Sequence, residues 1–284
     1  MNYFANKEDN MKYAKEHTLY MANKYPEDID LSVFNTIILS GEEDVAIPPI
    51  EISYPECEYV DSDTVSAILN SPGDTIWALN FASYKNPGGM FLYGSLAQEE
   101  SLCRESFLYN VISHERFKDY YAWNRENLNL GLYTNRMLIS PDIVFERGGF
   151  IRKANIITCA APNYTHLLKK YAQEAANPLV ASAMNLANFD RNVKVLESRI
   201  KFLLVNLRYR VKENDTVILG AFGCGVFKQD PTIVSQVFKD NLYILGKCHV
   251  IFAVPSGYSA KDHKTANVFR DMVQSYEKVR TYDT

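Results

Sequence analysis

The sequence is poor in the residues that build disulfides and metal sites. Its 284 residues contain five cysteines, and no two of them have Cys-x-x-Cys spacing. The five histidines are also scattered, and no His-Glu-x-x-His motif occurs. A disulfide framework and a zinc site are therefore not expected, and the cysteine usage fits a reducing compartment. We predict that the protein has no metal ligands.

Basic residues are not in excess, and long apolar runs are lacking. The formal net charge is -4, which argues against general attraction to nucleic acid or to an anionic membrane. The longest apolar stretch, VILGAFGCGVF, is well short of the roughly 18 residues that suggest a membrane span. The polar N-terminus has no signal-peptide core. We expect a cytoplasmic monomer that binds neither nucleic acid nor membrane and needs no cofactor.

Patterns of helix and strand are present along the whole chain. Apolar residues recur at steps of three and four over residues 11–25 and 193–207, which predicts helices. Near-continuous apolar runs over 75–83 and 154–163 are typical of strands buried on both faces. We expect further strands over 35–41, 51–60, 215–222 and 249–255, two strands or a hairpin over 135–150, and helices over 63–74, 230–243 and 260–276.

This alternation predicts an α/β fold with three layers. Helices should cover both faces of a mixed, mostly parallel central sheet. No internal repeat or linker rich in Pro, Gly or Ser divides the chain. We therefore expect one domain over residues 1–284, with residues 1–30 as a helical N-terminal extension.

The segment NPGGMFLYGSLAQEESLCRESFLY, residues 86–109, combines a glycine turn with two adjacent glutamates. The spacing of Ser95 and Gln98 is that of a capping box, which predicts a helix from Leu96 to Val111. Glu99 and Glu100 then fall in or beside its first turn. Acidic residues are favoured there by the helix dipole alone, so the pair by itself does not require a catalytic role.

Two glycine loops shift this interpretation toward a ligand site. Gly88 and Gly89 follow a buried strand, and ligands of open α/β sheets bind at the carboxyl ends of strands. The segment GAFGCGVFKQDP, residues 220–231, also follows a buried strand and ends in Asp230 and Pro231, a typical helix start. Such loops can offer N–H groups to phosphate or ribose oxygens. Together with the paired carboxylates, they predict a nucleotide-sugar ligand and acid/base chemistry.

Four segments, in this order, resemble those of the short microbial poly(ADP-ribose) glycohydrolases: NFASYKNPGG, QEE, ITCAAPN and LGAFGCGVF. The resemblance runs from about Met11 to about Tyr276. It implies a macrodomain-like fold that binds ADP-ribose in a cleft. It also implies hydrolysis of the ribose–ribose O-glycosidic bond at the end of ADP-ribose chains, so the expected partner is ADP-ribose or an ADP-ribosylated protein or polymer.

The resemblance also implies roles for individual residues. Glu100 would be the catalytic acid, and Glu99 would hydrogen-bond ribose hydroxyls. The expected ligand-binding residues are Asn80, Asn86 (for the ribose), Gly88, Gly89, Gln98, the diphosphate-binding Gly223, Cys224 and Gly225, and Val226 and Phe227 beside the diphosphate and the reacting ribose.

One position departs from the family pattern. Met90 stands where the family has a third glycine, and a methionine there either turns away from the site or narrows the ribose pocket. Two alternatives therefore accompany the glycohydrolase interpretation. One is an ADP-ribose-binding module without turnover, and the other is a hydrolase of mono-ADP-ribosylated protein or of small ADP-ribose derivatives.

Overall fold

A seven-stranded sheet forms the centre of the protein. The computed structural model describes residues 6–41, 53–174 and 178–280. The strands are β1 (Ile37–Leu39), β2 (Glu56–Val60), β3 (Ile76–Phe81), β4 (Met137–Arg147), β5 (Phe150–Cys159), β6 (Thr216–Leu219) and β7 (His249–Ala253). Their order is β1-β4-β5-β3-β6-β7-β2, and β5, β3, β6, β7 and β2 run parallel. The mixed, mostly parallel sheet predicted from the sequence is confirmed.

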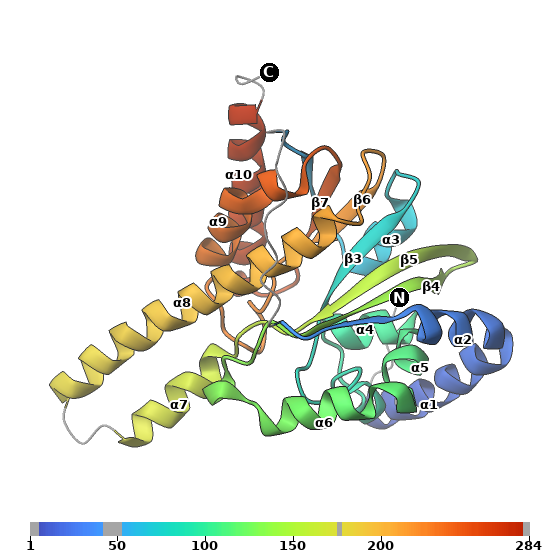
Figure 1. Ribbon diagram of the computed structural model, residues 1–284, viewed down its shortest axis with the longest axis horizontal. Helices are drawn as coiled ribbons and strands as arrows, with labels where there is room; N and C mark the ends of the chain where they lie inside the picture. The colour runs from blue at the N-terminus through green and yellow to red at the C-terminus, as the bar shows by residue number, and fades with distance from the viewer. Residues whose placement is uncertain (1–5, 42–52, 175–177, 281–284) are drawn as a thin grey trace.

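Helices lie on both faces of this sheet (Figure 1). They are α1 (Lys7–Lys24), α2 (Pro26–Asn35), α3 (Thr64–Asn70), α4 (Gln98–Arg104), α5 (Leu108–Ile112), α6 (Lys118–Glu126), α7 (Tyr164–Glu174), α8 (Pro178–Arg208), α9 (Pro231–Asn241) and α10 (Ala260–Arg280). Along β3, Trp77 and Leu79 join one buried cluster with α8, α9 and α10, while Ile76 and Ala78 join another with α1 to α5. Successive strand residues point to opposite faces, so the two clusters make three layers.

The predicted hairpin is a single long ribbon. β4 and β5 pair antiparallel from Met137–Cys159 to Arg147–Phe150. The two-residue turn consists of Gly148 and Gly149, with φ of 59° and 87°. A tight hairpin turn with two positive φ values matches strand twist, and glycine adopts it without a Cβ penalty.

Several boundaries differ from the sequence predictions. Pro26 does not simply end a helix, because it also occupies the first turn of α2, where its missing N–H costs nothing. α8 begins at Pro178 rather than near Val193, and α6 and α7 were not predicted. β2 begins at Glu56, after Pro55, although part of the predicted strand, 51–52, lies outside the described residues.

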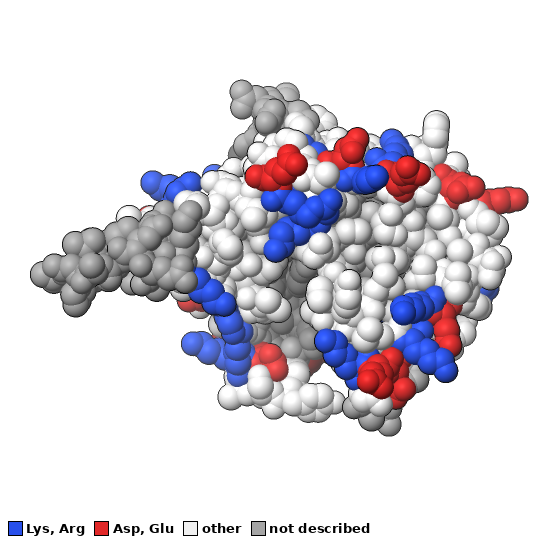
Figure 2. Space-filling view, turned by 90° about the horizontal axis from the view of Figure 1, so that it is seen from below, with Lys and Arg blue, Asp and Glu red and all other residues white. Residues whose placement is uncertain are grey.

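One face of the protein is seen when the view of Figure 1 is turned by 90°. Figure 2 shows that this face is hollowed near its middle, with Lys and Arg side chains on the rim of the hollow. Among the described helices, none is long and apolar enough to cross a membrane.

Candidate active site

Gln98 fastens the start of α4 to the end of β3. Its Oε1 accepts from the Phe81 N–H at 2.8 Å, and its Nε2 donates to the Leu79 carbonyl at 2.8 Å and to Thr64 Oγ1 at 3.1 Å. The predicted capping box is therefore wrong: the N-cap residue is Ala97, and no side chain caps the helix. The Gln98 amide satisfies open backbone groups at the strand end instead, where their burial makes partners necessary.

The helix that carries the glutamates is short. α4 ends at Arg104, and the chain turns before α5 begins at Leu108, so the single helix predicted from Leu96 to Val111 is two. Both Glu99 and Glu100 lie in the first turn of α4, as predicted, and they are 3% and 6% exposed.

Glu99 is held by donors from the end of β3. Its Oε2 accepts from the Ser83 N–H at 2.7 Å, and its Oε1 accepts from Asn80 Nδ2 at 3.3 Å. Asn80 also donates to Thr158 Oγ1 on β5. Burial raises the pKa of Glu99 to about 8, and the charge of Glu100 adds to this rise, while the donors oppose it.

Glu100 differs from Glu99 in having one oxygen without a partner. Its Oε1 accepts from the Met90 N–H at 2.8 Å. Its Oε2 is buried and has no hydrogen-bond partner among the residues that the structure describes. This oxygen can therefore take a partner from a bound group.

The backbone of the first glycine loop lies close to the two carboxylates. Gly89 has φ of 59°, and a Cβ there would stand 2.5 Å from Glu100 Oε1 and 2.9 Å from Glu99 Oε2. Gly88, with φ of 67°, would bring a Cβ to 2.6 Å from the Tyr109 ring. Its glycines thus make room for the glutamates, and the Gly89 N–H donates to the Asn86 carbonyl.

Met90 adopts a backbone conformation that needs no glycine. Its φ is -111°, well inside the range open to any residue, and its side chain is 44% exposed. The contact that Met90 makes with Glu100 comes from its backbone N–H.

The second glycine loop forms a cleft with the start of α4. The cleft measures about 150 Å³ and is lined by Phe81, Ala97, Gln98, Ala161, Ala221, Gly223, Gly225, Val226 and Phe227. The second glycine loop therefore lies beside Gln98 at the start of α4, whereas Gly88, Gly89, Glu99 and Glu100 are not among the residues that line the cleft. Asn86 does not line this cleft; it is exposed on the first loop.

Within the second loop the glycines have different surroundings. A Cβ on Gly223, where φ is 76°, would collide with Ala161 Cβ at 2.6 Å, whereas Gly225 faces open space. The Cys224 side chain is buried, and its N–H donates to the Ala221 carbonyl. The N–H groups of Gly225, Val226 and Phe227 find no acceptor within the part of the chain that the structure describes.

The sequence analysis missed two cations that hold these loops. Arg104 is 1% exposed, and it donates to the Ser95 carbonyl at 2.9 Å and to the Glu100 carbonyl at 3.4 Å. Lys261 Nζ donates to the Cys224 carbonyl at 3.1 Å. No local pattern predicts either role, because the Ser95 and Cys224 carbonyls belong to other segments than the cations that bond them.

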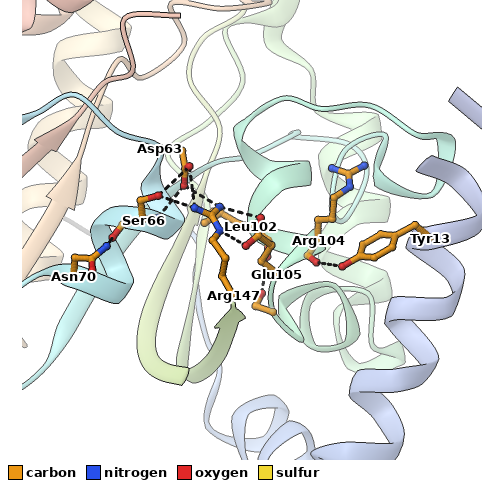
Figure 3. Close-up of polar contacts among 9 residues, drawn as sticks. Tyr13, Asp63, Ser66, Asn70, Leu102, Arg104, Glu105 and Arg147 are labelled. Atoms are coloured by element: carbon orange, nitrogen blue, oxygen red, sulfur yellow. Dashed lines mark hydrogen bonds and ion pairs between the residues drawn. The ribbon is translucent and has the colours of Figure 1, made fainter. Parts of the chain in front are cut away.

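The far end of α4 is anchored as well (Figure 3). The Arg147 guanidinium, at the tip of β4, donates to Glu105 Oε1 at 2.9 Å and to Asp63 Oδ2 at 3.0 Å. Tyr13 on α1 donates to the Arg104 carbonyl at 3.2 Å. A planar guanidinium between two carboxylates fixes orientation as well as distance, so α4 is held at both ends.

Comparison with known proteins decides the family. Residues 5–148 match the model of the catalytic domain of microbial-type PARG, poly(ADP-ribose) glycohydrolase. A PARG from Deinococcus radiodurans, solved in complex with ADP-ribose, is 31% identical over 87% of this chain and 97% of that one, with a TM-score of 0.70. The chain belongs to the microbial-type PARG family. The resemblance stated from the sequence is confirmed.

The PARG fold extends over nearly the whole chain. A PARG from Thermomonospora curvata aligns with 93% of this chain and 99% of that one, at a TM-score of 0.74 and 22% identity. The same protein bound to the inhibitor ADP-HPD aligns at 0.73 and 23% identity. No curated protein matches the sequence. PARG-type catalytic domains are glycosidases, so this member is an enzyme of that class.

A metal site in this PARG-type domain would require several ligating side chains close together. No group of three or more His, Cys, Asp or Glu side chains that could hold a metal ion occurs among the described residues.

Proposed function

We propose that the protein hydrolyses the ribose–ribose O-glycosidic bond of poly(ADP-ribose) from the chain end and releases ADP-ribose. The observation that carries this proposal is the pair of buried carboxyl groups, Glu99 and Glu100, which directly follow Gln98, a residue that lines a cleft together with the second glycine loop. Solved relatives in complex with ADP-ribose and with ADP-HPD support ADP-ribose as the bound unit.

The second loop supplies the diphosphate site in this proposal. The N–H groups of Gly225, Val226 and Phe227 have no acceptor in the described part of the chain and can donate to a diphosphate, and α9 follows after Asp230, which accepts from the Thr232 N–H. Phe227 and Val226 then pack against the diphosphate and the reacting ribose. Asn80, Asn86, Gly88, Gly89 and Gln98 surround the ribose end.

Glu100 acts as the general acid. Glycoside hydrolysis passes through an oxocarbenium-like transition state, so the departing oxygen needs a proton as the bond to the anomeric carbon breaks. Glu100 delivers that proton to the ribose oxygen of the leaving unit. Water then adds to the anomeric carbon, and its surplus proton returns to the carboxylate pair. Glu99 orients the ribose hydroxyls meanwhile.

A proton on Glu99, in the carboxyl group next to Glu100, suits this chemistry. The raised pKa of Glu99, about 8, keeps a proton in the site at neutral pH. A general acid must hold its proton at the working pH.

The domain organisation follows the same proposal. Residues 1–284 act as one domain, and the helices of the N-terminal extension support the catalytic helix through Tyr13 and the Arg104 carbonyl. The binding-module alternative rested on Met90, whose ordinary φ and exposed side chain give no reason to expect a misplaced ribose.

Replacement of Glu100 tests the catalytic assignment. Glu100→Gln keeps the shape of the side chain but removes its acid proton, so the release of ADP-ribose from polymer should fall by about 10²–10⁴-fold with little change in ADP-ribose affinity. Glu27→Gln is the matched control, because Glu27 also lies in a first helical turn but is exposed. Assays on polymer and on mono-ADP-ribosylated protein separate the substrate alternatives. Full turnover by Glu100→Gln would refute the role of Glu100.

A further inference from the structure

A second, larger cavity lies beyond the glutamates along the sheet. It measures about 680 Å³, within the range of small-molecule sites, and lies between α8 and the segment that precedes β4. Tyr133, Asn135, Asp190, Arg191, Lys194 and Arg199 are among its lining residues. The activity described above assigns nothing to this cavity.

The order of the strands relates this cavity to the cleft. The second glycine loop follows β6, the segment leading to the glutamates follows β3, and β5 and then β4 come next in the sheet. The cavity is lined by Thr134 and Asn135, directly before β4. A substrate whose diphosphate lies over β6 and whose scissile bond lies over β3 therefore extends toward this cavity on its leaving side.

Two aromatic side chains lie between the cleft and the cavity. Phe227 lines the cleft, and Tyr133 lines the cavity. Their rings are 6.0 Å apart in an edge-to-face arrangement, and Tyr133 stacks on Tyr84 at 4.3 Å. A polymer that runs along these rings leaves the cleft and enters the cavity.

The charges of the cavity favour an anion. Arg191 and Lys194 are exposed on one face of α8, and the buried Arg199 donates to Asn135 Oδ1 and to the Leu132 carbonyl. Asp190 is the acidic side chain among the described lining residues. Among the described lining residues three cations outnumber one carboxylate, and this local excess of positive charge favours a diphosphate although the net charge of the whole chain is -4.

We propose that this cavity is the subsite for the ADP-ribose unit on the leaving side of the scissile bond, with Arg191 and Lys194 binding its phosphates. The inference rests on the proposed function. The cavity would then give the enzyme a preference for polymer over substrates that carry a small leaving group.

Two substrates separate this subsite from the catalytic centre. One is poly(ADP-ribose), and the other is ADP-ribose that carries a small neutral alcohol on its terminal anomeric carbon. Lys194→Gln and Arg191→Gln should each raise KM for polymer at low salt by about fivefold, equivalent to ~1 kcal/mol for one exposed charge contact. KM for the small substrate and kcat for both should stay unchanged. Added salt should narrow the polymer difference, because it screens exposed charges.

Lys201→Gln is the matched control for charge. Lys201 lies on the same helix, seven residues from Lys194, and pairs with Glu197 outside the cavity. This variant should leave KM and kcat unchanged for both substrates. Unchanged polymer KM in both cavity variants, or equal losses on the two substrates, would overturn the subsite. A wild-type protein active on the small substrate alone would also overturn it, whereas inactivity on both substrates would refute the proposed function instead.

Discussion

Gly89 lies directly against Glu100: a Cβ on Gly89 would stand 2.5 Å from Glu100 Oε1. The same position is 2.9 Å from Glu99 Oε2, so one missing side chain leaves room for both carboxylates. The glycine turn before the Gln-Glu-Glu segment therefore has a steric reason. It lets the loop cover the acids and donate the Met90 N–H to one of them.

Gly89→Ala should lose activity for this steric reason. The new methyl group displaces Glu99 and Glu100, so ADP-ribose release should fall by at least about 100-fold, the range of a lost general acid. Gly148→Ala is the matched control, because Gly148 has the same φ of 59° but open space around it. It should lose ~1–2 kcal/mol of stability from backbone strain and keep full turnover. Similar turnover in the two variants would contradict the steric role of Gly89.

Gly225→Val should weaken ADP-ribose binding without unfolding the protein. Gly225 faces open space at the cleft, so valine fits the fold and occupies the proposed diphosphate position. We expect at least about a tenfold weaker Kd by calorimetric titration, equivalent to ~1.4 kcal/mol, and an unchanged Tm. Gly223→Val should lower Tm as well, because Gly223 has φ of 76° and no space for a Cβ. Unchanged affinity in Gly225→Val would place the diphosphate elsewhere.

Met90→Ala should leave both turnover and stability close to those of the wild type. The Met90 side chain is 44% exposed, and its N–H, which holds Glu100, is present in every non-proline residue. The free energy of unfolding should change by less than about 0.5 kcal/mol. Steady-state kinetics on polymer and on mono-ADP-ribosylated protein provide the check. A gain on polymer alone would show that methionine narrows the ribose pocket.

Glu99 should make stability depend on pH. Its pKa rises from 4.5 to about 8 on folding, so the folded protein keeps a proton that the unfolded chain has lost. This contribution is complete below about pH 4.5 and declines as the pH rises toward 8, by up to ~1.4 kcal/mol per pH unit. Glu99→Gln cannot ionise and should lack that decline. Urea unfolding of both proteins at pH 5, 6, 7 and 8 measures the difference, and parallel stability curves would show that Glu99 is ionised throughout.

Local rules were enough to predict much of the frame. The apolar run around β3, the hairpin predicted as one alternative over 135–150 and the cap of α9 at Asp230 each depend on residues within a few positions of one another. Glu99 and Glu100 were also predicted in or beside a first helical turn, although the capping box behind that prediction does not form. Such features are determined by neighbouring residues, whose backbone preferences and side-chain reach do not need the rest of the fold.

The tertiary structure decided how the site is held together. Gln98 has capping-box spacing with Ser95, yet it bonds Phe81 and Leu79, because the end of β3 brings unsatisfied backbone groups within its reach. Arg104 bonds the Ser95 carbonyl, and Lys261 reaches Cys224 across 37 residues. Sequence spacing predicts which groups a side chain can reach along its own helix. Which competing partner it takes depends on the buried polar groups that packing places beside it.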